Sequence, residues 1–156
     1  MVVTSTRFNL RNFAIVCLVV SVWVNVSEIF RYFVIVMPAM RSTLPMVPGV
    51  APMDIMIFSI WGFWDTLLVV LTVFAYWLCT GRFGETVVSV IVAGTFSWML
   101  LFVLLWIAMV NMALAKPGLL LWTLPLSWVE LVVACAIARI VFARVTASPA
   151  RAAATI

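Results

Sequence analysis

The sequence predicts an all-α polytopic membrane protein, a four-helix transmembrane bundle with both termini in the cytoplasm. Of its 156 residues, 67% are hydrophobic and 9% are charged, whereas soluble domains have about 45–50% apolar and about 25% charged residues. The mean hydropathy is +1.30. The apolar residues also fall into four runs, each longer than the roughly 20 residues that a helix needs to cross about 30 Å of hydrocarbon.

The four runs predict the four spans of a single transmembrane domain, residues 1–156. They cover about residues 13–37, 55–79, 86–113 and 119–143. In lipid the backbone polar groups must bond within the segment itself, so each run is expected to be a helix. The alternating pattern of a transmembrane β-barrel is absent from the sequence.

Breaker residues separate the runs. The segment 38–52 contains four prolines and one glycine, so we expect the first helix to end at Met37. Residues 80–85 and 115–118 predict two further turns. The first run resembles a signal peptide, but it continues to Met37 without an early small-residue cleavage site, so we interpret it as an uncleaved helix.

The basic residues predict the orientation. Membrane proteins keep extra arginine and lysine on the cytoplasmic side. With the N-terminus inside, the cytoplasmic side has five basic residues outside the spans and the outer side has two: Arg7, Arg11, Arg82, Arg144 and Arg151 against Arg41 and Lys116. The net charge of +4 therefore does not indicate a nucleic-acid partner. From its four spans we expect a multi-pass protein of the inner or plasma membrane.

Three acidic residues lie at one depth inside the predicted spans. Glu28, Asp65 and Glu130 are about 15, 14 and 13 residues from the cytoplasmic ends of their runs, which is roughly 20 Å of helix. Each ionised carboxylate at this depth costs about 2.5–3.5 kcal/mol on insertion scales. Such residues usually have a partner or a function.

Helical phase predicts that these acids face a shared interior. Each run has one face of small and polar residues, which we expect to pack inward while the bulky apolar face meets lipid. The predicted inward positions are Ser21, Asn25, Glu28 and Tyr32; Trp61, Asp65, Thr72 and Tyr76; Thr86, Ala93, Ser97, Ala108 and Asn111; and Thr123, Ser127, Glu130, Ala134 and Ala138.

A single base accompanies the acids. Arg31 lies one turn from Glu28 and can pair with one carboxylate, so the other acids must be protonated, share a proton or meet a cation. Aromatic faces beside carboxylates suit an organic cation. The predicted ligand-binding residues are Glu28, Asp65, Glu130, Arg31, Asn25, Trp61, Trp98 and Trp128. An acid paired with Arg31 is also typical of a simple helix–helix clasp.

Other chemistry has little support in the sequence. There is no histidine, and the three cysteines form no CxxC pair. No nucleophile–base pair, phosphate loop or metal-ligand cluster is present, so we expect neither an enzyme nor a cofactor. Five methionines lie in or near the predicted outer loop: Met37, Met40, Met46, Met53 and Met56. Thioether ligands suit Cu(I), but the sequence has no histidine to accompany them.

Two functions remain open. In the first, the midplane carboxylates bind or transport a proton or a small organic cation. In the second, the chain is an accessory or assembly subunit of a larger membrane complex and has no transport activity of its own. Four helices enclose little volume, so we expect a homo-oligomer or a complex subunit within the lipid bilayer.

Overall fold

The computed structural model describes the backbone of residues 8–50 and 54–153, and the side chains as far as residue 147. Within these residues all regular structure is helical, and four helical stretches are long and apolar enough to cross a membrane: Leu10–Thr43, Ile55–Phe83, Val87–Asn111 and Pro117–Ala147. The expected helical class is confirmed, and the four helices are consistent with a membrane bundle.

The first span continues beyond its predicted end at Met37. It consists of α1 (Leu10–Arg31), the π-helical segment η1 (Tyr32–Val36) and α2 (Met37–Thr43). Pro38 lacks an N–H, and its ring crowds the preceding turn. The wide η1 turn lies just before Pro38, and the N–H of Met37 donates to the carbonyl of Tyr32, five residues back. This turn lets the helix pass Pro38 and end at Thr43, shortly before Pro45.

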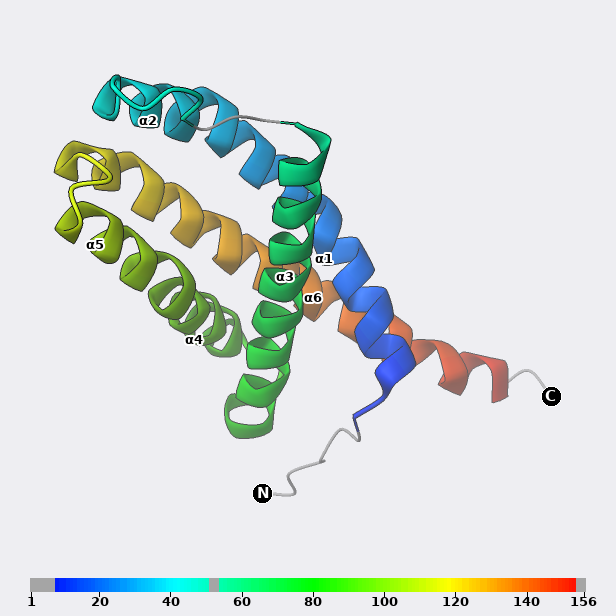
Figure 1. Cartoon of the computed structure of the whole chain (residues 1–156). Coiled ribbons are helices and arrows are strands. Elements are labelled where there is room, and N and C mark those ends of the chain that lie inside the picture. Colours follow the sequence, from blue (N-terminus) through cyan, green and yellow to red (C-terminus); the bar gives the residue numbers. More distant parts are fainter. Residues whose placement is uncertain (1–7, 51–53, 154–156) are drawn as a thin grey trace.

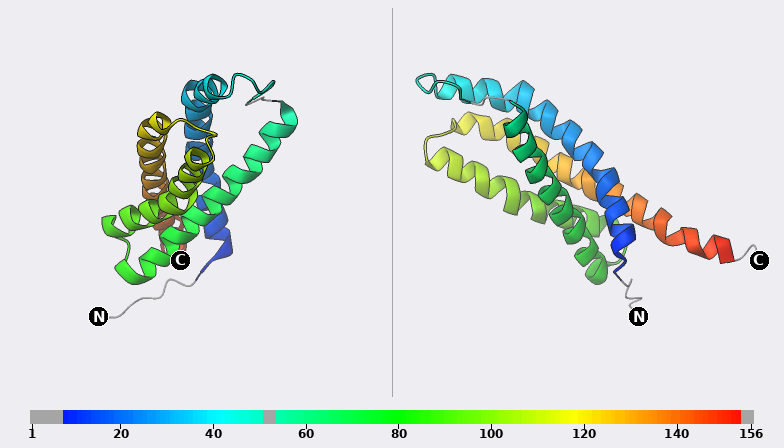
Figure 2. Two further views of the ribbon diagram at one scale, coloured as in Figure 1. Left: turned by 60° about the vertical axis from the view of Figure 1, so that its left-hand side comes forward. Right: turned by 45° about the vertical axis from the view of Figure 1, so that its right-hand side comes forward.

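The second span, α3 (Ile55–Phe83), begins at an N-cap and ends at a glycine. The carboxylate of Asp54 accepts a hydrogen bond from the N–H of Ile57 at 2.9 Å. Gly84, with φ of 69°, ends the helix four residues later than predicted. No residue from 55 to 64 is buried, whereas six residues from Asp65 to Tyr76 are. The N-terminal part of α3 therefore stands away from the other helices, as Figure 2 shows.

The third span also contains a π-helical turn, which moves its buried face. It consists of α4 (Val87–Trp98), η2 (Met99–Val103) and α5 (Leu104–Asn111). Ala93 and Ser97 are buried as predicted, but the predicted positions Thr86, Ala108 and Asn111 are exposed. A π-helical turn holds an extra residue, so the step from Ser97 to the next buried residue, Phe102, is five positions. Trp106 follows four positions later on the same buried face.

The fourth span consists of η3 (Pro117–Leu119) and α6 (Leu120–Ala153). It extends beyond the predicted end at Ala143. The inward face follows the prediction throughout, because all five predicted positions are buried: Thr123, Ser127, Glu130, Ala134 and Ala138.

Helix α6 is the centre of the bundle. Helices α1 and α4 pack against it, and α3 crosses to contact α1, α4 and α6 (Figure 1). The N-terminal end of α1 and the C-terminal end of α6 lie at one end of the bundle. The loop after α2 and the loop after α5 lie at the other end, as an even number of spans requires.

The inward face of α1 differs from the prediction. Val16, Val20 and Val24 are fully buried, whereas Ser21 and Asn25 of the predicted polar face are only half-buried. Ser21 Oγ donates to the carbonyl of Leu18, and Asn25 Nδ2 donates to that of Ser21, both at 2.8 Å. Because these polar groups bond to their own helix, they need no partner on another one.

We predict that Gly94→Ala destabilises the contact between α4 and α6. A Cβ at Gly94 would lie 2.9 Å from the Cα of Val132 and 3.0 Å from its backbone nitrogen. Because backbone atoms must move to admit it, the variant should lose about 1–3 kcal/mol of unfolding free energy, measured by thermal or denaturant unfolding in detergent. Gly81→Ala is the matched control, since nothing lies within 4 Å of that position. Equal stability of the two variants would contradict this packing.

Candidate functional site

The three predicted acids converge around Arg31 near the middle of the bundle. Arg31 pairs with both Glu28 and Glu130. Asp65 is close enough to Glu28 and Arg31 to interact with both electrostatically. These contacts are consistent with the common depth expected from the sequence.

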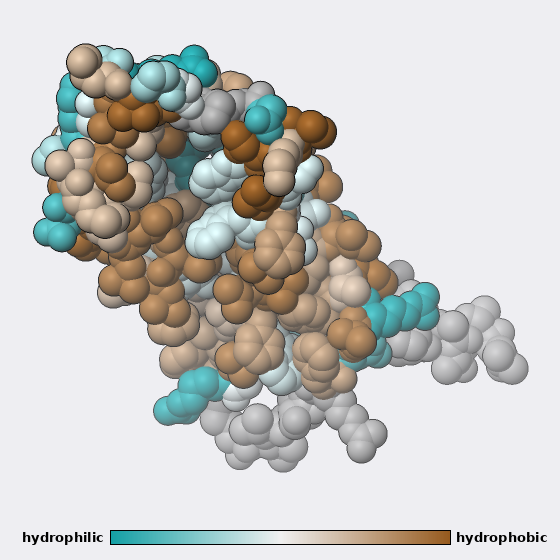
Figure 3. Space-filling view, in the orientation of Figure 1, coloured by the Kyte–Doolittle hydropathy of each residue, from teal (hydrophilic) through white to brown (hydrophobic). Residues whose placement is uncertain are grey.

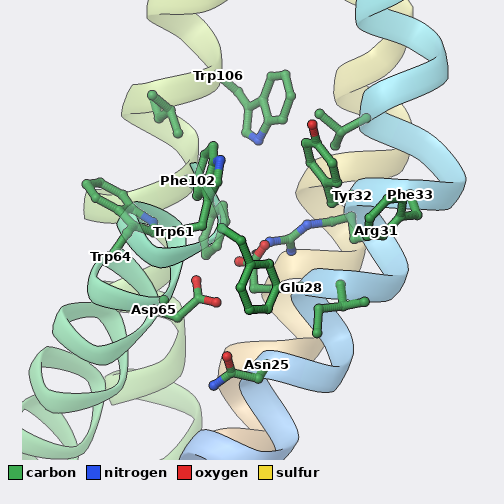
Figure 4. A pocket seen from close by; sticks show the side chains of 15 residues that line it. Asn25, Glu28, Arg31, Tyr32, Phe33, Trp61, Trp64, Asp65, Phe102 and Trp106 are labelled. Atoms are coloured by element: carbon green, nitrogen blue, oxygen red, sulfur yellow. Dashed lines mark hydrogen bonds and ion pairs between the residues drawn. The ribbon is translucent and has the colours of Figure 1, made fainter. Parts of the chain in front are cut away.

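Arg31 is buried, with 4% of its surface exposed, and two glutamates share it. Its Nη1 donates to Glu130 Oε2 at 3.0 Å, and its Nη2 donates to Glu28 Oε1. The guanidinium carbon lies 4.5 Å from the ring centroid of Phe102, a cation–π contact. Figure 4 shows the guanidinium directed toward the centre of this group. Arg31 thereby connects α1 to α6 and contacts the third span at η2.

Glu130 is the most deeply buried acid, with 1% exposure. Its Oε2 accepts hydrogen bonds from Arg31 and, at 2.7 Å, from Ser27 Oγ. Its Oε1 is buried without a hydrogen-bond partner among the described residues. The backbone carbonyl of Glu130 accepts from Trp23 Nε1 at 3.0 Å, a second connection between α1 and α6.

Asp65 of α3 is buried but unpaired. It is 7% exposed, and in the part of the chain that the structure describes it forms no ion pair and no hydrogen bond. It is close enough to Glu28 and Arg31 to interact with both electrostatically. With all three acids ionised, the group would carry three negative charges against the single positive charge of Arg31.

A cavity of about 150 Å³ lies in front of Asp65 and Glu28. Its walls come from α1 and η1, from the N-terminal half of α3, and from η2 and α5, and Figure 4 shows most of the lining side chains. The aromatic residues predominate: Tyr32, Phe33, Phe58, Trp61, Trp64, Phe102 and Trp106. In Figure 3 the molecule is hollowed between the α2–α5 side and the upper part of α3.

Five of the eight predicted site residues line this cavity: Asn25, Glu28, Arg31, Trp61 and Asp65. Glu130 lies behind them and is bonded to Arg31. The structure does not bring Trp98 and Trp128 to the site. Trp98 Nε1 donates to the carbonyl of Leu124 at 2.8 Å, and Trp128 Nε1 donates to Thr95 Oγ1 at 3.0 Å, so both fasten α4 to α6.

The predicted site lacks six of the seven aromatic residues that line the cavity: Tyr32, Phe33, Phe58, Trp64, Phe102 and Trp106. Trp64 adjoins Asp65 in the sequence, and Tyr32 belongs to the predicted polar face of its helix, so both could have been found. Phe102 and Trp106 follow the η2 turn, which shifts them onto the inward face. Regular helical phase could not have placed them there.

Within the described residues, no three histidine, cysteine or acidic side chains converge closely enough to hold a metal ion. Cys17, Cys79 and Cys135 are free thiols. Of the methionines near the first loop, Met46 and Met56 are exposed, at 90% and 73%. Met53 lies outside the described residues.

Comparison with known proteins adds no assignment. No family model matches the chain, and no curated protein and no solved structure is significantly similar to it. The geometry of the site therefore carries the functional argument.

We predict that Arg31→Leu strongly destabilises the fold. It would leave Glu28 and Glu130 without their shared cation, and breaking a buried ion pair by removing one partner costs about 3–5 kcal/mol. Unfolding in detergent measures the loss. Arg82→Leu, at an exposed arginine near the end of α3, is the control and should stay within about 0.5 kcal/mol of the wild type.

The double variant Arg31→Leu/Glu130→Leu should recover part of this stability, because it removes the buried charge of Glu130 together with its partner, while Glu28 still lacks its cation. A double variant as unstable as Arg31→Leu alone would show that packing around Arg31, and not charge pairing, accounts for the loss.

Proposed function

We propose that this chain is a small multi-pass membrane protein that binds a small organic cation or a proton, in exchange for one another, at Asp65 and Glu28. The transport of that cation or proton across the membrane is the function that this site supports best. The observation that carries the proposal is Asp65, a buried carboxylate at the floor of an aromatic cavity, with no ion-pair or hydrogen-bond partner among the residues that the structure describes.

Charge balance supports a ligand at Asp65. Arg31 compensates one negative charge of Glu28 and Glu130, which leaves one surplus charge on that pair and another on Asp65. Two uncompensated charges at this depth would cost about 5–7 kcal/mol on insertion scales, comparable to the whole stability of a domain. Protons or a bound cation remove this cost.

The aromatic walls support an organic cation. Tryptophan and tyrosine faces attract cations, and the attraction is stronger where the site is shielded from water. Trp61, Trp64 and Trp106 surround the approach to Asp65 (Figure 4). The cavity is also well above the roughly 10–15 Å³ that one water molecule requires, so it has room for a substituted ammonium group.

The environment of Glu130 supports an exchangeable proton. One of its oxygens is buried without a donor, and an ionised carboxylate in that state is costly. Glu130 also interacts electrostatically with both Glu28 and Asp65. A cation arriving at Asp65 would therefore favour loss of a proton from the group, which couples cation binding to proton release.

We predict that Asp65→Asn leaves folding intact or improves it while abolishing cation binding, because the buried surplus charge disappears together with the binding group. Tryptophan fluorescence titrated with tetramethylammonium in nanodiscs at several pH values measures binding, and denaturant unfolding measures stability. Asp54→Asn is the matched control. Asp54 is exposed at the N-cap of α3, and asparagine also caps helices.

Two results would contradict the site. Equal titrations of Asp65→Asn and the wild type would show that Asp65 binds no cation. A stability loss above about 3 kcal/mol in Asp65→Asn would indicate a structural clasp. Separately, a protein that is stable only with a partner subunit would favour the accessory-subunit function.

We also predict that both termini are cytoplasmic, from the excess of arginine at that end. In a variant without native cysteines, Met46→Cys should react with an impermeant thiol reagent from outside, and Glu85→Cys should react from the cytoplasmic side. Both positions are exposed. The loops that hold them, after α2 and after α3, lie at opposite ends of the bundle (Figure 1). Reaction of Met46→Cys from the cytoplasmic side would reverse the topology.

A further inference from the structure

The cavity at Asp65 opens toward the lateral surface of the bundle. Its charged and amide-bearing residues, Asn25, Glu28, Arg31 and Asp65, are half-buried or buried. Its rim consists of apolar and aromatic side chains that are also part of the exposed surface: Ile29 (42% exposed), Phe33 (43%), Phe58 (47%), Trp61 (44%), Trp64 (38%) and Leu105 (40%). The cavity is therefore continuous with the surface that would meet lipid tails.

The splayed half of α3 makes this lateral opening. Residues 55–64 of α3 contribute no buried side chain, and Figure 2 shows this part of the helix diverging from α1. The rim residues on one side belong to α3, and those on the other side belong to the first and third spans. Phe58 lies seven residues before Asp65, about 10 Å along the helix, so the opening runs from the buried acid toward the outer end of the span.

A ligand that fits both the charged interior and the apolar rim of the cavity needs a cationic head and an apolar tail. The head would meet the carboxylates of Asp65 and Glu28 and the aromatic faces beside them. A polar or charged tail would have to lie against Phe58, Trp64 and Leu105 without hydrogen-bond partners, which is unfavourable. A hydrocarbon tail can leave between these side chains and remain in apolar surroundings.

We propose that the cavity binds a single-chain amphiphilic cation, an alkylammonium compound that enters from the bilayer with its head toward Asp65 and its tail directed out between α3 and α5. This inference rests on the proposed cation site and adds the ligand class and its route. Head recognition is electrostatic and aromatic, and the tail adds affinity through the hydrophobic effect alone.

The test compares alkyltrimethylammonium compounds with one head and different tails, from tetramethylammonium through hexyl- to dodecyltrimethylammonium. Each is titrated against the full chain in nanodiscs by tryptophan fluorescence, with Asp65→Asn as the blank at every tail length. If the tail stays in apolar surroundings when bound, each methylene should lower the half-saturating aqueous concentration about fourfold. The hexyl compound, with five more methylenes, should then saturate at a concentration about a thousandfold lower than tetramethylammonium does, and the dodecyl compound at a lower one still.

The outcomes separate this inference from the proposed function. If tetramethylammonium binds in an Asp65-dependent way and longer tails bind no better or not at all, the site takes short cations from water and the amphiphile proposal fails alone. If no compound distinguishes the wild type from Asp65→Asn, the cation site itself fails, and the amphiphile proposal fails with it.

Discussion

The shared guanidinium of Arg31 is the interaction on which the arrangement of this bundle depends. Glu28 lies one turn before it on the same helix, Glu130 approaches from α6, and the ring of Phe102 covers its face from the third span. Three of the four spans thus meet at one charged group. Arginine stays protonated in any protein environment, so this positive charge is permanent and fixes how many of the surrounding acids can be ionised at low cost.

The second span does not take part in this network. Asp65 faces the network around Arg31 across a cavity, and α3 is packed into the bundle only from Asp65 onward. Two consequences follow from this one arrangement. The carboxylate lacks an internal cation, and the half of α3 preceding it leaves an aromatic-walled opening. If α3 were packed onto the bundle along its whole length, Asp65 would be paired or excluded, and neither the charge surplus nor the opening would exist.

The sequence predicted the parts of this structure that depend on hydrophobic length and regular phase. The four spans follow from runs of apolar residues, and the buried face of α6 follows from its 3.6-residue period, from Thr123 to Ala138. The common depth of the three acids is consistent with their convergence around Arg31. Proximity of Arg31 to the acids could be predicted from its spacing to Glu28.

What the sequence did not predict depends on local backbone geometry and on polar groups bonded within one helix. The η1 turn carries the first span past Pro38, and the η2 turn moves Phe102 and Trp106 inward. Reasoning from a fixed helical period predicts neither of these π-helical turns. Ser21 and Asn25 bond to their own backbone, so a valine face could pack inward instead. Trp98 and Trp128 have the right depth, but they face the contact of α4 with α6.

We propose that the acids outnumber their cation and that a proton neutralises Asp65 until a ligand cation displaces it. Infrared difference spectroscopy of the protein in nanodiscs at neutral pH measures this directly, because a protonated carboxyl group and a carboxylate have distinct carbonyl bands. The account predicts a protonated-carboxyl band that disappears when dodecyltrimethylammonium is added, and no such change in Asp65→Asn. A spectrum without protonated carboxyl groups in the ligand-free protein would contradict it, since the bundle would then tolerate its surplus charge unaided.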